Sequence, residues 1–307
     1  MRESELHTHI ETIASDMTRR FPRVLLGPGD DCAMFVGSDR MLVTVDQVVE
    51  GRHFEGGTPI DLIARKAVAR SISDLAAMAS VPVCAVATGL LPPSYPHARE
   101  LTECLHHWAN HWKCPLVGGD IATGSDGPQG SALSLTVTAI GEVGPGERAI
   151  TRSSARVGDS VYVTGRLGNS LASGRHLTFE PRLADALWLR STLKEDLHAM
   201  IDLSDGLGRD AARIARASAV GITIDADLLP LHPETPGWRN GLSDGEDYEL
   251  CFTSARALPA GARTPGGTEI TRIGVVIARP EDPHAWCSVR TPDGATIDAS
   301  GMGWEHG

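Results

Sequence analysis

The sequence is poor in lysine and has no long apolar run. Its 28 basic residues include three lysines, Lys66, Lys113 and Lys194, so few side chains are candidates for a catalytic lysine. No apolar run approaches the ~20 residues that span a bilayer, and residues 1–20 contain no apolar signal core. We therefore expect a cytoplasmic protein with no membrane partner.

Several common site signatures are also missing. The six cysteines are scattered, and none forms the C-x-x-C spacing of a zinc knuckle or a redox pair. The phosphate loop G-x-x-x-x-G-K-[ST] is excluded, because Gly-Lys never occurs in the chain. The formal net charge of −11 argues against nucleic acid as a partner. If a nucleotide binds, we expect metal ions to hold its phosphates.

Carboxylates recur beside glycine or serine, next to apolar runs. The clearest cluster is Gly-Pro-Gly-Asp-Asp-Cys-Ala over residues 27–33, and others contain Asp46, Asp74, Asp120, Asp205 and residues 244–247. Each cluster alone is also typical of a solvated turn or a helix cap. As a set they indicate hard divalent cations such as Mg²⁺, which take oxygen ligands and usually bring phosphates with them. The sequence therefore predicts a site for several metal ions and a nucleotide.

The chain is long enough for two domains, and its turn-rich segment over residues 144–159 is the best boundary. We place the domains at residues 1–146 and 147–307. Periodicity predicts helices over residues 3–19, 60–79, 97–112, 168–176, 181–191 and 205–218, with Ser204 as the N-cap of the last. It predicts strands over residues 41–45, 83–90, 115–117, 131–141, 160–164, 246–253 and 270–276.

The motifs, taken in order along nearly the whole chain, resemble the thiamine-phosphate kinase family. They include G-P-G-D-D-C-A, V-T-V-D, V-E-G-R-H-F, V-G-G-D, I-D-L-S-D-G-L and G-E-D-Y-E-L. The superfamily also contains aminoimidazole ribonucleotide synthetase. The resemblance implies a two-domain α/β fold with mixed sheets, whose N-terminal sheets pair across a homodimer. It implies an N-terminal domain that binds ATP and metal, and direct in-line transfer from ATP to thiamine monophosphate with several Mg²⁺ ions.

The resemblance also implies roles for individual residues, with no protein nucleophile. Metal assistance would come mainly through Asp30, Asp74 and Asp205. The full set of implied metal ligands is Asp30, Thr44, Asp46, Asp74, Asp120, Asp202 and Asp205. The residues implied to meet ATP are Gly119, Asp120, Arg152 and Ser204. His53 would meet the substrate phosphate region, and Glu246 and Trp304 would hold the cationic thiamine end.

Some positions depart from the family pattern. Valine replaces a second threonine at Val45, and Ala79, Ser154 and Asp244 stand where glycine is usual. The stretch containing Arg175 and His176 is unusually basic, which indicates either an anion contact or a capped helix end. Two other functions stay open: a kinase or cyclo-ligase of the superfamily with a different phosphorylated substrate, and a non-catalytic protein that kept the fold.

Overall fold

The computed structural model describes residues 5, 9–10, 12–28, 32–125, 131–282 and 284–305. The chain divides into two compact units. The first contains residues 1–75 and 80–148, and the second contains residues 76–79 and 149–307. The functional roles that the resemblance gives to the two domains stay predictions.

The first unit is built on a four-stranded mixed sheet in the order β3-β6-β4-β5. β4 and β5 run parallel, whereas β6 is antiparallel to both of its neighbours. A small β1–β2 hairpin and helix α2 precede this sheet. The elements are α2 (Met17–Arg20), β1 (Val24–Leu26), β2 (Met34–Phe35), β3 (Met41–Val49), α3 (Ile60–Ala77), β4 (Val81–Leu91), α4 (Ala98–His111), β5 (Leu116–Thr123) and β6 (Ser134–Glu142).

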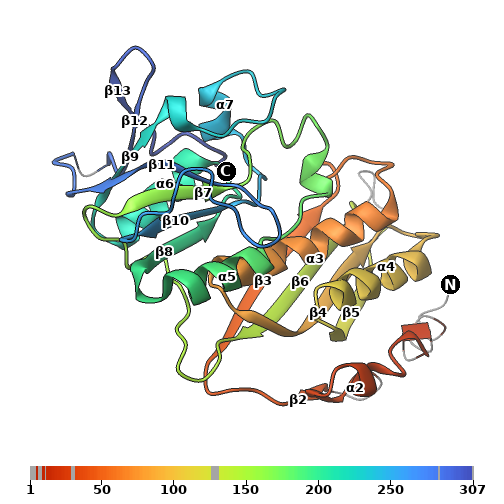
Figure 1. The fold of residues 1–307 in the computed structure, drawn as a ribbon. Helices are drawn as coiled ribbons and strands as arrows, with labels where there is room; N and C mark the ends of the chain where they lie inside the picture. Colours follow the sequence, from red (N-terminus) through yellow and green to blue (C-terminus); the bar gives the residue numbers. More distant parts are fainter. Residues whose placement is uncertain are drawn as a thin grey trace. The chain divides into compact units, whose positions relative to one another are not determined.

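Helices α3 and α4 lie over the four-stranded sheet (Figure 1). The buried face of α3 includes Ala64 and Val68, and its Ser71 hydroxyl donates a hydrogen bond to the Val137 carbonyl of β6 at 2.9 Å. On β6, Leu135 and Val137 are buried and alternate with half-buried Ser134 and Thr136, which confirms the predicted pattern of a half-buried strand. This packing fixes the residues of α3 against the sheet.

The end of α3 has a conformation that suits glycine at position 79, the residue that the resemblance implies there. Ala79 has a φ of +50°, in the left-handed region that favours glycine. The Ser80 N–H bonds to the Leu75 carbonyl at 3.0 Å, and the Ala79 N–H bonds to the Ala76 carbonyl at 2.8 Å, as in a glycine-terminated helix. The Arg190 guanidinium donates to the Ala79 carbonyl at 2.5 Å and thereby supports this turn.

The second unit contains a seven-stranded mixed sheet in the order β13-β12-β9-β11-β7-β10-β8. β12 and β9 run parallel, and the other neighbours are antiparallel. The main elements are β7 (Ser160–Thr164), α5 (Leu183–Leu193), β8 (Leu197–Asp202), α6 (Leu207–Ala217), β9 (Gly221–Asp225), α7 (Trp238–Ser243), β10 (Leu250–Ser254), β11 (Ile270–Ile277), β12 (Cys287–Arg290) and β13 (Thr296–Asp298).

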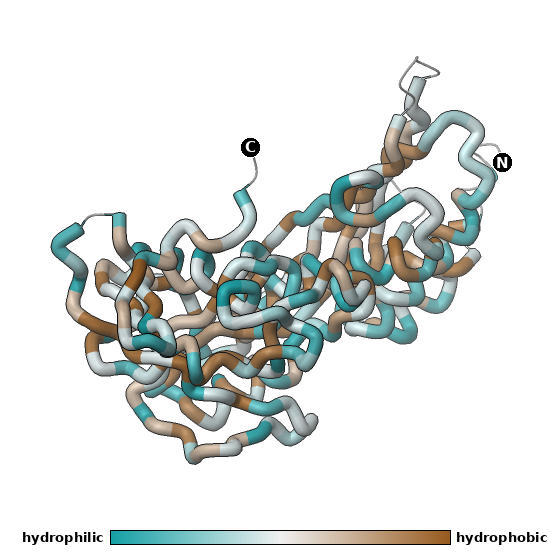
Figure 2. The backbone as a smooth tube through the Cα atoms, turned by 90° about the horizontal axis from the view of Figure 1, so that it is seen from above, coloured by the Kyte–Doolittle hydropathy of each residue, from teal (hydrophilic) through white to brown (hydrophobic). Residues whose placement is uncertain are grey.

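Successive residues of the central strand β7 enter two different cores. Val161 and Val163 belong to a core with residues of α6, whereas Tyr162 belongs to a core with residues of α5. Figure 2 shows apolar segments inside this unit and more hydrophilic loops around them. The two-sided burial explains why β7 reads as an almost continuous apolar run. The mixed α/β architecture of both units confirms the predicted fold class.

Several predicted elements are correct and others are wrong. Helices α3, α4, α5 and α6 and strands β3, β4, β6, β7 and β11 appear where periodicity placed them. The helix over residues 168–176 is wrong, because Gly168, Asn169 and Gly174 have positive φ and leave only a 3₁₀ turn at Arg175–Leu177. The strand over residues 246–253 begins only at Leu250. The predicted helix over residues 3–19 falls partly outside the described residues.

Two more corrections concern the site segments. Ser204 is not an N-cap: the cap of α6 is Gly206, whose φ is +110°. A Cβ at Gly206 would lie 2.9 Å from the Leu242 carbonyl oxygen, so glycine is required there. The strand predicted over residues 115–117 is too short, because β5 extends to Thr123 and includes Gly118, Gly119 and Asp120. None of the described helices is both long and apolar enough to pass through a bilayer.

Candidate active site

Strand β3 and helix α3 bring two predicted metal ligands together. Thr44 and Asp46 are two residues apart on β3, so both point to the same face of the sheet. The Thr44 hydroxyl donates a hydrogen bond to the Asp74 carboxylate on α3. Two hard oxygen donors from distant parts of the sequence therefore meet at this position.

Asp46 lies beside a guanidinium that the sequence analysis missed. Arg70 is one helical turn before Asp74 on α3 and donates to the Asp46 carboxylate at 2.9 Å. It also donates to the Gln47 carbonyl at 3.2 Å. The i,i+4 spacing of Arg70 and Asp74 was the available signal, because residues with this spacing share one face of a helix.

Asp120 lies apart from this group, on the opposite edge strand of the sheet. It is exposed, and within the described parts of the chain its carboxylate makes no hydrogen bond or ion pair. The preceding Gly119 allows the backbones to approach closely, since a Cβ there would meet the Ala87 carbonyl oxygen at 2.0 Å. Asp120 therefore presents an accessible carboxylate beside a position that only glycine fits.

His53 follows β3 in a turn. Its Nδ1 accepts a hydrogen bond from the Val49 N–H at 3.0 Å, which places the proton of the neutral ring on Nε2. The buried Lys66 ammonium donates to the His53 carbonyl at 2.7 Å and so helps to hold the turn. Asp30, another predicted metal ligand, lies outside the described residues.

In the second unit, four predicted site residues are joined through backbone contacts. The Glu246 N–H donates to the Ser204 carbonyl at 2.8 Å, and the Trp304 N–H donates to the Asp205 carbonyl at 2.8 Å. The loop after β8, the loop before β10 and the C-terminal tail therefore meet at residues 204–205. Asp202, at the end of β8, is buried with 4% of its surface exposed.

Asp205 is also linked to two residues of α6 that the sequence analysis did not assign to the site. Its carboxylate accepts from Arg213 at 2.5 Å, and its N–H donates to the Asp210 carboxylate at 3.0 Å. Burial raises the pKa of Asp210 to about 6, although Arg213 and the Asp205 N–H oppose this change. The i,i+3 spacing of Asp210 and Arg213 was the available signal.

Glu246 has a left-handed backbone with a φ of +62°. Its carboxylate lies 3.3 Å from Nδ1 of His176, and its carbonyl accepts from the Ser170 hydroxyl at 2.7 Å. Asp244, at a position where the resemblance implies glycine, accepts from the Asn169 N–H at 2.8 Å. Its charge therefore stabilises a neighbouring turn. Arg152 is exposed, and its carbonyl accepts from the Ser218 hydroxyl at 2.8 Å.

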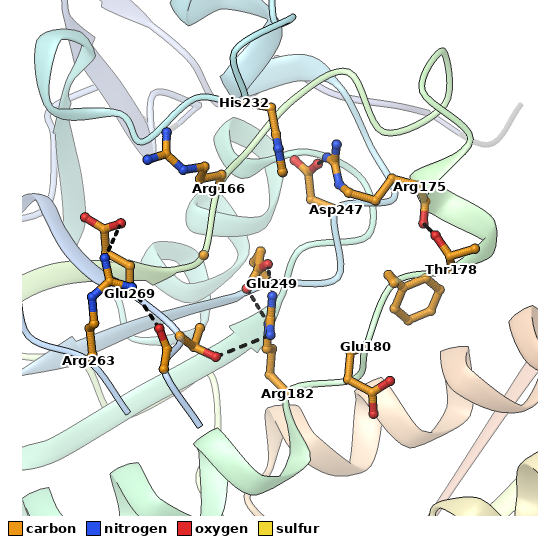
Figure 3. A pocket seen from close by; sticks show the side chains of 14 residues that line it. Arg166, Arg175, Thr178, Glu180, Arg182, His232, Asp247, Glu249, Arg263 and Glu269 are labelled. Atoms are coloured by element: carbon orange, nitrogen blue, oxygen red, sulfur yellow. Dashed lines mark hydrogen bonds and ion pairs between the residues drawn. The ribbon is translucent and has the colours of Figure 1, made fainter. Parts of the chain in front are cut away.

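A pocket of about 480 Å³ lies within the second unit and is lined by ion pairs (Figure 3). Arg175 contacts Asp247 at 2.8 Å, and Arg182 contacts the buried Glu249 at 2.5 Å. Burial raises the pKa of Asp247 to about 7, against the Gly168 N–H and Arg175. The Arg175 side chain is paired with Asp247. This pairing does not test the anion contact expected for Arg175, which stays a prediction.

The donor chemistry of these residues fits magnesium that arrives with phosphates. Among the described residues, no group of three or more histidine, cysteine, aspartate or glutamate side chains could hold a metal ion. Mg²⁺ does not require such a cage, because it is usually bound through one or two carboxylates, water and substrate phosphates. Asp46, Asp74 and Asp120 in the first unit and, separately, Asp205 in the second are hard oxygen donors of the type that such binding uses.

Comparison with known proteins finds relatives along most of the chain. Models described as "AIR synthase related protein" match residues 29–143 for the N-terminal domain and residues 121–288 for the C-terminal domain. The thiamine-monophosphate kinase of Rhodopirellula baltica is 35% identical over 285 residues, which cover 85% of this chain and 86% of that protein.

Two solved structures are also similar. The thiamine-monophosphate kinase of Stenotrophomonas maltophilia K279a has a TM-score of 0.77 at 30% identity, covering 94% of this chain and 97% of that chain. AaThiL complexed with AMPPCP and TMP has a TM-score of 0.71 at 26% identity, covering 100% and 99%. The chain belongs to the AIR synthase-related proteins and, within them, to the thiamine-monophosphate kinase family.

Proposed function

We propose that this protein transfers a phosphoryl group from ATP to thiamine monophosphate, giving thiamine diphosphate and ADP. The observation that carries the proposal is the similarity, over the full length of the chain, to AaThiL complexed with AMPPCP and TMP. AMPPCP is a non-hydrolysable analogue of ATP, and we take TMP there as thiamine monophosphate. The curated kinase relative covers 85% of this chain, which supports the same activity.

Such a reaction brings two phosphate groups together against their repulsion. Each pair of unit charges at ~4 Å costs about 1 kcal/mol even in water, and several at a protein surface. Mg²⁺ ions held by Asp30, Thr44, Asp46, Asp74, Asp120, Asp202 and Asp205, some through water, would neutralise this charge. The acceptor phosphate is already deprotonated near neutral pH. The residues of the chain therefore have to position the phosphates, and no protein nucleophile is required.

Two contacts in the first unit support this positioning role. The hydrogen bond from Thr44 orients the Asp74 carboxylate, and the ion pair with Arg70 orients that of Asp46. Because Nδ1 of His53 is an acceptor, the Nε2–H of the neutral ring is the donor that would meet the acceptor phosphate. Gly119, Asp120, Arg152 and Ser204 would contact ATP.

The cationic end of thiamine would lie at Glu246 and Trp304. Both residues are attached to the loop at residues 204–205 by backbone hydrogen bonds of 2.8 Å. A thiazolium ring is attracted to a carboxylate and to the face of an indole. The side chain of Trp304 suits this role because 54% of its surface is exposed.

The proposal includes a homodimer formed by the sheets of the first unit. β3 is an edge strand, and its Val43 and Val45 side chains are 72% and 61% exposed. Exposed apolar side chains on an edge strand are typical of a surface that another chain covers. We also propose a cytoplasmic location, because the reaction consumes ATP.

The direct test is ADP release from Mg-ATP with and without thiamine monophosphate, with the products separated by chromatography. We expect thiamine diphosphate and ADP in equal amounts, formed only when both substrates are present. ADP without thiamine diphosphate, or no turnover, would contradict the proposed acceptor. It would leave a different phosphorylated metabolite as the substrate.

A further inference from the structure

Asp205 is fixed at three points by two separate segments. Its N–H donates to the Asp210 carboxylate at 3.0 Å, and its carbonyl accepts from the Trp304 N–H at 2.8 Å. Its carboxylate accepts from the Arg213 guanidinium at 2.5 Å. Helix α6 therefore controls both the backbone and the side chain of this residue, and the C-terminal tail adds a third contact.

Arg213 connects Asp205 to a buried anchor. One terminal nitrogen of its guanidinium contacts Asp205, and the other contacts Asp210 at 2.6 Å. Asp210 has no exposed surface, so its own position is set by the packing around it. The planar guanidinium transmits that fixed position to the Asp205 carboxylate, whose side chain is 12% exposed.

The charges of this group still suit a cation. Two carboxylates and one guanidinium leave one net negative charge at the end of β8. Arg213 also reduces the repulsion between Asp205 and Asp210, which would otherwise turn the two carboxylates away from each other. A bond between Arg213 and Asp210 alone would satisfy the buried carboxylate. The additional bond to Asp205 therefore has another consequence, which is the orientation of that side chain.

We propose that Arg213, aligned by the buried Asp210, is a positioning residue that fixes the Asp205 carboxylate for binding a divalent cation. The inference rests on the function proposed above, in which Asp205 is a metal ligand. Residues that orient a metal ligand typically contribute 10–100-fold to metal affinity. The geometry requires a planar guanidinium whose two terminal nitrogens each contact a different carboxylate, and lysine lacks this rigid fork although it keeps the charge.

The test uses the full chain and measures Mn²⁺ binding in the presence of AMPPCP, from the electron paramagnetic resonance signal of unbound Mn²⁺. The variants are Arg213→Gln and Arg213→Lys, and the control is Arg216→Gln, an exposed arginine on the same helix. We expect both Arg213 variants to weaken Mn²⁺ binding ~10-fold or more. The control should stay within about twofold of the wild type, and circular dichroism confirms that each variant is folded.

Three results would overturn the inference. If Arg213→Lys binds Mn²⁺ as the wild type does, charge and not orientation is what matters. If Arg213→Gln binds as tightly as the wild type, or more tightly, Arg213 does not help the cation to bind. If the wild type itself fails to bind Mn²⁺ with AMPPCP, the proposed function fails and this inference fails with it. Binding by the wild type with unchanged variants removes the inference alone.

Discussion

Arg182 is the side chain whose loss should most clearly destabilise the second unit. It contacts Glu249, of which 5% is exposed, through Nε at 2.7 Å and through a terminal nitrogen at 2.5 Å. The Thr164 hydroxyl supplies a third hydrogen bond to this carboxylate at 2.7 Å. Arg182→Met keeps most of the apolar stem but leaves Glu249 with only the hydroxyl among these three contacts.

The expected loss of unfolding free energy is about 3–5 kcal/mol at pH 8, the cost of leaving one partner of a buried ion pair alone. Burial already raises the pKa of Glu249, and Arg182 is the main influence that lowers it. A carboxyl whose pKa is higher in the folded state holds its proton there while the unfolded chain has lost it. Stability then falls as pH rises above the ordinary range of glutamate. The loss of unfolding free energy in Arg182→Met, relative to the wild type, should therefore become smaller as pH falls towards 5.

A matched control is available in the same pocket. Arg263 lies 3.4 Å from Glu269, but the two side chains are 58% and 33% exposed. Arg263→Met should therefore cost less than about 1 kcal/mol. Urea unfolding followed by tryptophan fluorescence at pH 5 and pH 8 measures both variants. Equal small losses for the two variants, or a deficit of Arg182→Met that grows towards pH 5, would refute the reasoning.

Three further predictions concern the site. Asp74→Asn removes the carboxylate that Thr44 orients, so kcat should fall by ~10²-fold or more. A normal rate of ADP release by this variant would mean that Asp74 is not a metal ligand. Trp304→Ala should raise KM for thiamine monophosphate ~2–30-fold and KM for ATP much less. Steady-state kinetics that show an unchanged KM for thiamine monophosphate would contradict this. Folding raises the pKa of Asp247 from 3.8 to about 7. The free energy of unfolding of the wild type should therefore fall by up to ~4 kcal/mol, relative to that of Asp247→Asn, as pH rises from 4 to 7. A difference between the two proteins that stays constant with pH in urea unfolding would contradict this.

Elements with one buried face could be predicted from the sequence. Helix α4 and strand β6 keep their buried residues on one side, and this period is visible without any tertiary contact. The failures occur where distant segments decide the conformation. The strand predicted over residues 115–117 stops before Gly118 and Gly119, yet β4 pairs with both glycines and extends β5 to Thr123. Gly119 is needed there for the close approach of Ala87, which no local pattern reveals.

The sequence could propose residues for the candidate site but not their arrangement. Arg70 and Arg213 were missed because an arginine on a helix usually indicates an exposed face, and only the fold brings them to Asp46 and Asp205. The contact between Asp205 and Trp304 joins residues 99 positions apart through main-chain atoms, so it leaves no signature in the side chains. This has a consequence for Trp304→Ala: the substitution removes the indole ring but keeps the N–H that contacts Asp205. A change in KM for thiamine monophosphate would therefore report on the ring, and not on detachment of the tail.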